Sequence, residues 1–284
     1  MAKAYAFKLK FEALSPLLVG AGSVVGNIKE SFKMGKYYVI PASSWKGALR
    51  REALTAAYFL NLDQKTRQIL AEHLEAKGEQ KEGVGFHDGK GCSGMPEIKS
   101  SKGFVDIEAA RESLEPELYH LIHESMRVDE AEAEICAALK NFACPVDSIF
   151  GSMYFSSLSN FSSSVFTGRP EYRYRTSIDR LTMSVASGHL FVDEVVWPSS
   201  NVELYATLIV PDRKELYGYV RDPESITAVW KATLDRLSKT GVSLGSGKSY
   251  GLGLLRLKPE ESTFLEVPEK GEGYKWSSLD EFLA

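Results

Sequence analysis

The chain has 284 residues, of which 44% are hydrophobic and 25% charged, and these ordinary globular values exclude collagen-like, disordered and disulfide-scaffold classes. Its net charge of −4 argues, for the chain taken as a whole, against a protein that binds nucleic acid. However, 17 of the 38 acidic residues lie in residues 103–135 and 259–284, so the rest of the chain holds 30 basic and 21 acidic residues and can attract a polyanion.

The N-terminal part of the chain predicts two strands and a helix. Residues 4–13 alternate between apolar and polar side chains, which indicates a half-buried antiparallel strand. A loop punctuated by glycines follows at residues 20–27, and a short strand at residues 37–40 ends at a proline. Ser43 or Ser44 is then expected to cap a helix with an apolar face.

A polar, largely helical segment is expected next, before the composition changes to that of β-structure. Residues 61–82 and 106–142 are rich in charged helix formers, and the glycine-rich residues 83–103 between them predict a mobile loop. Ser, Thr, Tyr, Phe, Arg and Val predominate in residues 155–200, which predicts hairpins, one of them long and projecting. Residues 202–210 predict a strand, residues 224–239 a helix and residues 252–258 a closing strand.

Without the insertions, the predicted order is strand, helix, strand, strand, helix, strand. This is the split βαβ pattern of ferredoxin-like folds, which RNA-recognition modules share, so the fold class is α+β with an antiparallel sheet. Because many unrelated functions use this fold, the pattern by itself assigns no activity. The expected division is a ferredoxin-like core at residues 1–60 and 201–258 with part of 140–170, a largely helical insertion at 61–140, a β-hairpin region at 155–200 and an acidic C-terminal tail at 259–284.

The segment GSGKSYGLG at residues 245–253 contains a Gly-Lys-Ser triplet, but it is not a nucleotide-binding loop. Val242 stands where a Walker loop needs its first glycine, and the GxGxxxG spacing is not that of a dinucleotide site. Glycines allow close backbone approach and positive φ, which suit N–H groups that face a phosphate. A tight turn before the closing strand is the alternative, and the glycines alone do not separate the two.

Residues 40–51 place two hydroxyls, those of Ser43 and Ser44, and several basic side chains in the first turns of the predicted helix. The N–H groups and the positive dipole end of a helix attract anions, and basic side chains one turn apart add charge-assisted contacts to phosphate. The alternative is a capped helix with a solvated basic face. The basic residues are Lys46, Arg50 and Arg51.

Arginines and aromatic residues alternate in residues 166–180. Aromatic rings can stack on bases while guanidinium groups hold the backbone, as in proteins that bind single strands. The same alternation fits an exposed hairpin strand with cross-strand pairs, and both interpretations stay open. The arginines are Arg169, Arg173, Arg175 and Arg180, with Tyr172 and Tyr174 among them.

The sequence predicts no metal site and no disulfide. Cys92, Cys136 and Cys144 are an odd number without a CxxC pair, which favours a reducing cytoplasm and makes Cys136 a small core residue. His120 and His123 are three residues apart, but no spacing in the chain matches a zinc module. No apolar run is long enough for a membrane span and the charged N-terminus is unlike a signal peptide, so we expect a cytoplasmic protein.

The motif IPASSWKGALR at residues 40–50, combined with the late glycine-rich segment at residues 245–253, resembles the RAMP (repeat-associated mysterious protein) superfamily of CRISPR effector subunits. Three further segments are similar to family elements: the glycine-rich residues 20–27, the CPVDSIFGS motif at residues 144–152, and residues 175–196 of the projecting hairpin. The motifs are specific together, whereas none of them is specific alone. The resemblance spans nearly the whole chain apart from the helical insertion and the tail.

Within the superfamily, the chain most resembles the backbone subunits of type III (Csm/Cmr-like) complexes, which act in antiviral and plasmid defence. The resemblance implies binding to a CRISPR guide RNA and to target RNA, contacts with other subunits of the effector complex and self-association along RNA, without membrane contact. The hairpin resembles the family's thumb, which inserts between bases at regular intervals. The implied RNA-binding residues are Ser43, Ser44, Lys46, Arg50, Arg51, Gly245, Gly247 and Lys248, with Arg169, Arg173, Arg175 and Arg180 in or beside the thumb.

The sequence departs from the family pattern at two positions. Ala42 replaces a glycine, and Asn27 stands where cleaving subunits carry an aspartate; a neutral amide binds a metal ion or activates a ribose hydroxyl poorly. Glu30 takes that place only if the register is shifted. We therefore expect RNA binding that requires no cofactor, and we assign no catalytic residue. The alternatives are a Mg²⁺-dependent endoribonuclease that cuts target RNA or processes guide RNA, and a ferredoxin-like interaction domain that binds no RNA.

Overall fold

The structure is a computed structural model that describes residues 2–25, 28–75, 89–96, 98, 100–101, 103–179, 181–267 and 273–284. Its chain divides into two compact units. The helical unit consists mainly of Ala53–Leu158 and Ile209–Trp230, and the sheet unit consists of Lys3–Glu52, Ser159–Leu208 and Lys231–Ala284.

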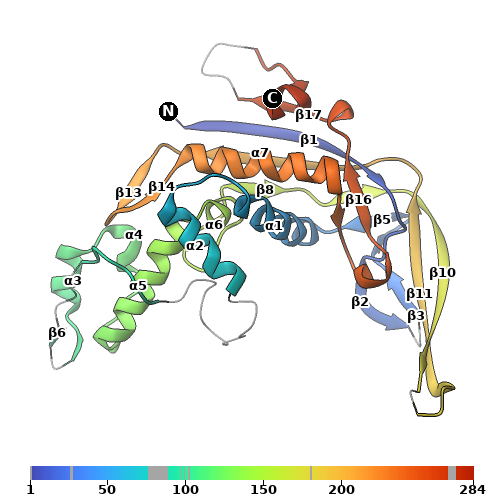
Figure 1. Ribbon diagram of the computed structural model, residues 1–284, viewed down its shortest axis with the longest axis horizontal. Coiled ribbons are helices and arrows are strands. Elements are labelled where there is room, and N and C mark those ends of the chain that lie inside the picture. Colours follow the sequence, from blue (N-terminus) through green and yellow to red (C-terminus); the bar gives the residue numbers. More distant parts are fainter. Residues whose placement is uncertain are drawn as a thin grey trace. The chain divides into compact units, whose positions relative to one another are not determined.

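The sheet unit is built on a sheet whose core strands are β1 (Lys3–Ala13), β8 (Ser159–Phe161), β12 (Val202–Val210) and β16 (Leu254–Leu257). They stand in the order β16, β1, β12, β8, which along the chain is fourth, first, third, second. Figure 1 labels β1, β8 and β16 among them. The helices α1 (Ala42–Tyr58) and α7 (Pro223–Thr240) lie in two of the three connections between core strands, and β15 (Val242–Ser243) extends the sheet beside β16. This order confirms the predicted α+β, ferredoxin-like fold.

The main sheet buries one face because its strands alternate. In β1, Phe7, Leu9 and Phe11 have no exposed surface, whereas the residues between them are partly exposed. Trp45 of α1 is also fully buried, with its ring centroid 4.7 Å from that of Phe11, and its indole N–H donates to Ser164 Oγ at 2.9 Å. The indole therefore anchors the first turn of α1 to the core with its polar atom satisfied.

Helix α1 begins at Ala42, so the prediction that Ser43 or Ser44 caps it is wrong. The Pro41 carbonyl accepts the N–H of Ser44 at 3.0 Å, and the Ala42 N–H donates to the hydroxyl of Ser163 at 3.2 Å. A proline is tolerated at a helix start, and a serine from another segment supplies the capping oxygen. The two predicted serines consequently lie inside the first turn.

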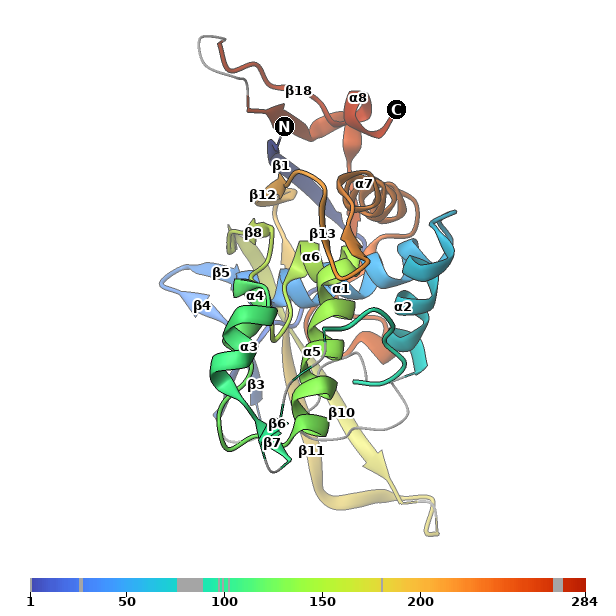
Figure 2. The same ribbon diagram turned by 90° about the vertical axis from the view of Figure 1, so that its left-hand side faces the viewer.

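A second sheet contains the projecting hairpin. Its strands are β2 (Gly20–Val25), β3 (Ile28–Ser31), β10 (Gly168–Ile178) and β11 (Val185–Pro198), in the order β10, β11, β3, β2. The prediction of a long hairpin in residues 155–200 is confirmed, and Figure 2 shows β10 and β11 extending together to a distant tip. The loop predicted at residues 20–27 is wrong for residues 20–25, because β2 pairs antiparallel with β3.

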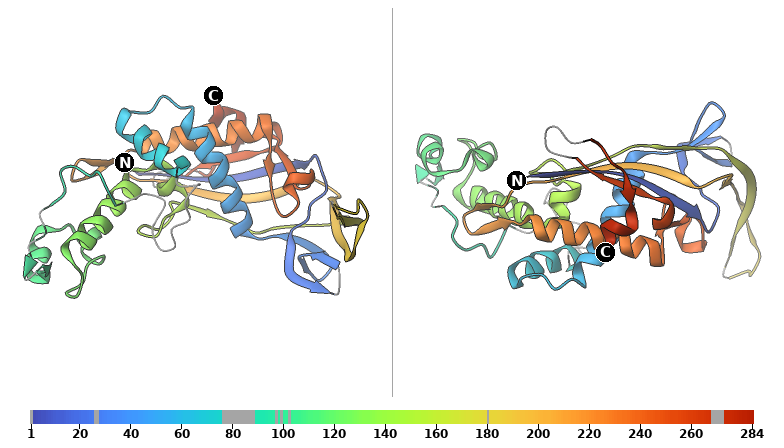
Figure 3. Two further views of the ribbon diagram at one scale, coloured as in Figure 1. Left: turned by 60° about the horizontal axis from the view of Figure 1, so that its bottom comes forward. Right: turned by 90° about the horizontal axis from the view of Figure 1, so that it is seen from above.

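Short strands and the C-terminal segment complete the sheet unit. The strands β4 (Lys33–Met34), β5 (Tyr37–Ile40) and β9 (Ser164–Phe166) form a small sheet. In Figure 3 the blue strands β2 to β5 and the yellow hairpin lie at the same end of this unit. Near the C-terminus, β17 (Thr263–Glu266) pairs with β1 and with β18 (Ser277–Ser278), and α8 (Leu279–Leu283) places the Phe282 ring 5.1 Å from that of Phe7. The C-terminal residues thus add to the core.

Helices form in both segments that were predicted to be helical, residues 61–82 and 106–142, as far as these are described, but residues 106–142 hold three helices rather than one or two. The helical unit contains α2 (Gln64–Glu75), α3 (Ile107–Ser113), α4 (Pro116–Tyr119), α5 (Val128–Ala143) and α6 (Pro145–Phe150), with the short ribbons of β6 (Ser100–Ser101) and β7 (Phe104–Val105) and of β13 (Lys214–Leu216) and β14 (Tyr219–Arg221). Much of the predicted mobile loop at residues 83–103 lies outside the described residues. None of the described helices combines the length and apolar character that a membrane crossing requires.

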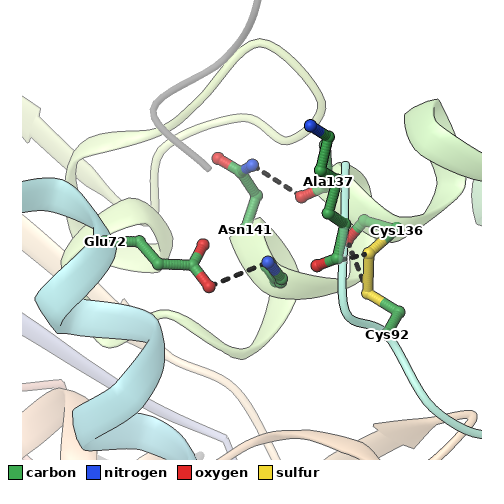
Figure 4. The surroundings of a disulfide bond; sticks show 7 residues. Glu72, Cys92, Cys136, Ala137 and Asn141 are labelled. Atoms are coloured by element: carbon green, nitrogen blue, oxygen red, sulfur yellow. Dashed lines mark hydrogen bonds and ion pairs between the residues drawn. A yellow bond between two sulfur atoms is a disulfide. The ribbon is translucent and has the colours of Figure 1, made fainter. Parts of the chain in front are cut away.

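The prediction that the chain has no disulfide is wrong. Cys92 and Cys136 form a disulfide that ties the segment at residue 92 to helix α5, with Cα atoms 5.7 Å apart (Figure 4). Beside it, Lys140 Nζ contacts Glu72 Oε1 at 2.8 Å in an ion pair that joins α5 to α2. Cys92 and Cys136 are 44 residues apart in sequence, so spacing rules for adjacent cysteines could not identify the disulfide. Cys144 is a buried thiol whose pKa is raised by burial.

Candidate nucleic-acid interface

A shallow groove of about 470 Å³ lies in the sheet unit where the start of α1 meets the late glycine-rich turn. It brings together two segments that are about 200 residues apart in sequence. Ser43, Ser44, Gly245 and Lys248 all line it, and so do Arg51 and Lys29. The other lining residues are Val19, Gly20, Gly47, Ala48 and Ser246.

The glycine-rich turn is held by backbone hydrogen bonds. The Ser246 N–H donates to the Leu18 carbonyl at 2.7 Å, and the Gly253 N–H donates to the Pro16 carbonyl at 2.9 Å. Gly245 has φ +78°, and a Cβ atom there would lie 2.3 Å from the Leu18 carbonyl oxygen. Only glycine therefore permits this approach of the two backbones, which fixes the floor of the groove.

Gly245→Ala is expected to lower the free energy of unfolding by at least about 3 kcal/mol, because the left-handed backbone and the overlap with Leu18 both oppose a side chain. The matched control is Gly47→Ala, at a helical position with no atom within 4 Å of the added Cβ. That control should raise stability slightly, since alanine is the better helix former. Thermal unfolding of both variants checks this; equal melting temperatures would contradict it.

Three cations surround the groove. Arg51 Nη2 donates to the Ser243 carbonyl at 3.1 Å, and Lys29 Nζ donates to Ser246 Oγ at 2.9 Å. Burial and the nearby charge of Arg51 lower the pKa of Lys248, although Glu52 acts in the opposite direction. The positive charges in the groove therefore repel one another, and a bound anion relieves this repulsion.

The start of α1 determines which of its side chains line the groove. The lining positions 43, 44, 47, 48 and 51 follow the three- and four-residue spacing of one helix face. Lys46 and Arg50 were predicted with this group, but neither lines the groove, since both positions fall just outside the edge of the face that Ser43 begins. Arg51 does line it.

The hairpin separates its arginines from its tyrosines. Arg169, Arg173 and Arg175 share one face of β10 with Glu171, while Tyr172 and Tyr174 occupy the other. The register pairs Arg173 with Asp193 of β11, and Asp193 with Lys29 of β3, so the arginine face continues into the groove. Arg180 lies outside the described residues.

The structure identifies two buried carboxylates at the base of the hairpin that the sequence analysis missed. Asp193 binds Arg175 through both carboxylate oxygens, and this hydrogen bonding raises the pKa of the Arg175 guanidinium. Glu194 accepts from Lys33 Nζ at 2.6 Å and from the Tyr38 hydroxyl at 3.3 Å, and the bond to Glu194 raises the pKa of Lys33. In the sequence, these two acids stand directly before the apolar Val195 and Val196, and this pattern could have indicated that they are buried.

Of the two candidate catalytic positions, only Glu30 is described, and it faces away from the groove. Asn27 lies outside the described residues. Glu30 follows Lys29 directly in β3, so its side chain points to the opposite face from the one that Lys29 shares with the groove. Among the described residues, no group of three or more His, Cys, Asp or Glu side chains is placed to hold a metal ion.

Comparison with known proteins gives one family assignment. No curated protein matches the chain. The family model of the RAMP superfamily matches residues 10–256, which includes both segments of the groove and the whole hairpin. The chain therefore belongs to the RAMP superfamily, and this membership supports a CRISPR-associated role in RNA binding.

Proposed function

We propose that the protein is a guide-RNA-binding backbone subunit of a type III CRISPR ribonucleoprotein. The observation that carries this proposal is the groove in which Lys29, Arg51 and Lys248, from three separate segments, converge beside the first turn of α1. The described residues that line it include no carboxylate, so it suits a polyanion better than a cation.

The chemistry of the groove fits a ribose-phosphate strand rather than particular bases. The hydroxyls of Ser43 and Ser44 and the N–H groups of the first helical turn can donate to phosphate oxygens, and the helix dipole favours negative charge there. Lysine and arginine add charge-assisted hydrogen bonds. Such contacts position a strand without reading its sequence, as a subunit that accepts any guide requires.

The hairpin extends this surface toward a base-paired target. Its arginine face is continuous with the groove through Lys29, and we assign Arg169 and Arg173 to contacts with RNA beyond the groove. The tyrosines on the other face are exposed, Tyr172 by 56% and Tyr174 by 69%, and are free to stack on bases or on a neighbouring subunit. Repetition of this subunit along one guide is part of the proposal.

Salt dependence of RNA affinity tests the proposed function. If the three groove cations neutralise about three phosphates, the plot of log affinity against log salt for single-stranded RNA should have a slope near −2. Fluorescence anisotropy with two labelled RNAs of unrelated sequence, between about 50 and 200 mM salt, measures this, and both RNAs should give the same slope. A slope near zero would contradict a phosphate-binding groove.

A cleavage assay on the protein with guide RNA distinguishes a subunit that only binds RNA from one that also cuts it. Incubation with guide and labelled target RNA, with and without Mg²⁺, should leave the target intact if the subunit only binds. Regularly spaced products that disappear in Glu30→Ala would instead favour the endoribonuclease. An absorbance spectrum of the purified protein addresses the remaining alternative, because co-purified RNA raises the absorbance at about 260 nm, whereas an interaction domain without RNA leaves an ordinary protein spectrum.

A further inference from the structure

Arg175 is held in place by a buried acid. Its Nε atom donates to Asp193 Oδ2 at 2.6 Å and its Nη2 atom donates to Asp193 Oδ1 at 3.0 Å, which is the bidentate geometry of a strong guanidinium–carboxylate pair. The Asp193 side chain is only 2% exposed. Its carboxylate therefore neutralises most of the charge that Arg175 could offer to a phosphate.

The other side of the Arg175 guanidinium meets the glycine-rich turn. It lies 4.6 Å from the ring centroid of Tyr250, within stacking distance. Tyr250 closes the short 3-10 helix that begins at Lys248, and its ring lies so close to Gly247 that a Cβ atom there would be 2.6 Å from Cε2. The ring thus packs between the guanidinium and the backbone of the turn.

A second link joins the same sheet to the same turn. Lys29 pairs in register with Asp193 across β3 and β11, and its Nζ atom donates to Ser246 Oγ at 2.9 Å. The turn is therefore attached to the hairpin sheet at Ser246 on one side of Lys248 and at Tyr250 on the other. Two attachments that flank one cation restrict where its ammonium group can lie.

We propose that Arg175 is a positioning residue, which holds the Tyr250 ring and through it the turn that presents Lys248, and that it does not itself contact RNA. This inference rests on the proposed function of the groove. It differs from the role that the family resemblance implies for Arg175. It also means that the base of the hairpin and the glycine-rich turn move together. Displacement of the hairpin base would then alter the grip on the RNA strand.

Tyr250→Leu is the first test, because it removes the stacked ring and leaves the buried Arg175–Asp193 pair intact. We expect about 10-fold weaker binding of single-stranded RNA with the salt slope of the unmodified protein, since no phosphate contact is lost. Arg175→Ala should do the same, and the double variant should be no weaker than either single one. Lys248→Ala is the matched contact variant, and its slope should be smaller in magnitude by about 0.7.

An RNA-free measurement keeps this inference separate from the proposed function. Amide hydrogen exchange of residues 246–251 should be faster in Tyr250→Leu and in Arg175→Ala than in the unmodified protein. Arg175→Lys keeps the charge but lacks the planar fork, so it should exchange as fast as Arg175→Ala. Unchanged exchange, unchanged RNA affinity, or a slope reduced by about 0.7 in Arg175→Ala would each overturn the positioning role. If the unmodified protein shows no salt-dependent binding, the proposed function fails, whereas the exchange result still decides the role of Arg175.

Discussion

Replacing Lys29 and Lys248 together by glutamate should weaken the binding of single-stranded RNA roughly 100-fold, because each cation is worth about 1.5 kcal/mol in a charge-assisted contact to phosphate. The loss should be larger than for either single variant and should be similar for RNAs of unrelated sequence. At position 248 stability should change little, since a glutamate there replaces the repulsion between Lys248 and Arg51 by attraction. The change at position 29 removes the bond to Ser246 Oγ, so its effect on stability is read from the single variant. Anisotropy titration at fixed salt, with a melting curve for each variant, measures both effects.

A charge-matched control is available in the same unit. Lys3 and Lys239 are 58% and 70% exposed at the side chain and take part in surface ion pairs with Glu266 and Asp235. Their joint replacement by glutamate changes the net charge equally, but exposed pairs contribute little to stability and lie outside the groove lining. If this control loses as much affinity as the groove variant, RNA is attracted by net charge alone and the groove has no special role.

Cys92→Ser should destabilise the protein by about 2–5 kcal/mol, because the disulfide with Cys136 closes a long loop and so restricts the unfolded chain. For a chain of this size, that corresponds to a fall of roughly 10 °C in melting temperature. Differential scanning fluorimetry under non-reducing conditions measures the change. Reductant should lower the melting temperature of the unmodified protein by the covalent part of this change, and it should leave the variant unchanged.

Melting temperatures measured with and without reductant separate the effect of the disulfide bond from that of the serine side chain. A serine at position 92 also changes the packing of the segment against α5, and this packing effect persists in reductant, whereas the covalent effect does not. A variant that melts with the unmodified oxidised protein would show that the pair contributes no cross-link in solution. RNA affinity measured in parallel should be unaffected, because both cysteines belong to the helical unit and the groove to the sheet unit.

Local sequence patterns predicted most of the fold, because each depends on residues that are close in the chain. The strict alternation in β1 and β12 and the helical period of α7 locate these elements correctly. The C-terminal residues were read as a tail, since their acidity concealed Phe264 and Phe282, which pack on the main sheet. Pairing between β17 and β1 joins segments more than 250 residues apart, which no local pattern encodes.

The candidate site was predictable in its outline and not in its details. The motifs gave the helix start and the glycine-rich turn, and the structure joins them in one groove. Lys29 was missed because a loop was predicted where β2 forms and no strand was predicted at β3, so that the alternation of β3 could not be read. The choice of Arg51 over Lys46 depends on where α1 begins and on the buried Trp45, and both are set by tertiary contacts.

The alternation of β10 gives the hairpin two chemically different faces. This extended segment of 11 residues presents arginines on one side and tyrosine rings on the other, so its odd and even positions can contact different molecules. Selection on one ligand can then change one set of positions without disturbing the other. A shift of register by one residue would exchange the two sets, which makes the alignment of β10 with β11 as important as the residues themselves.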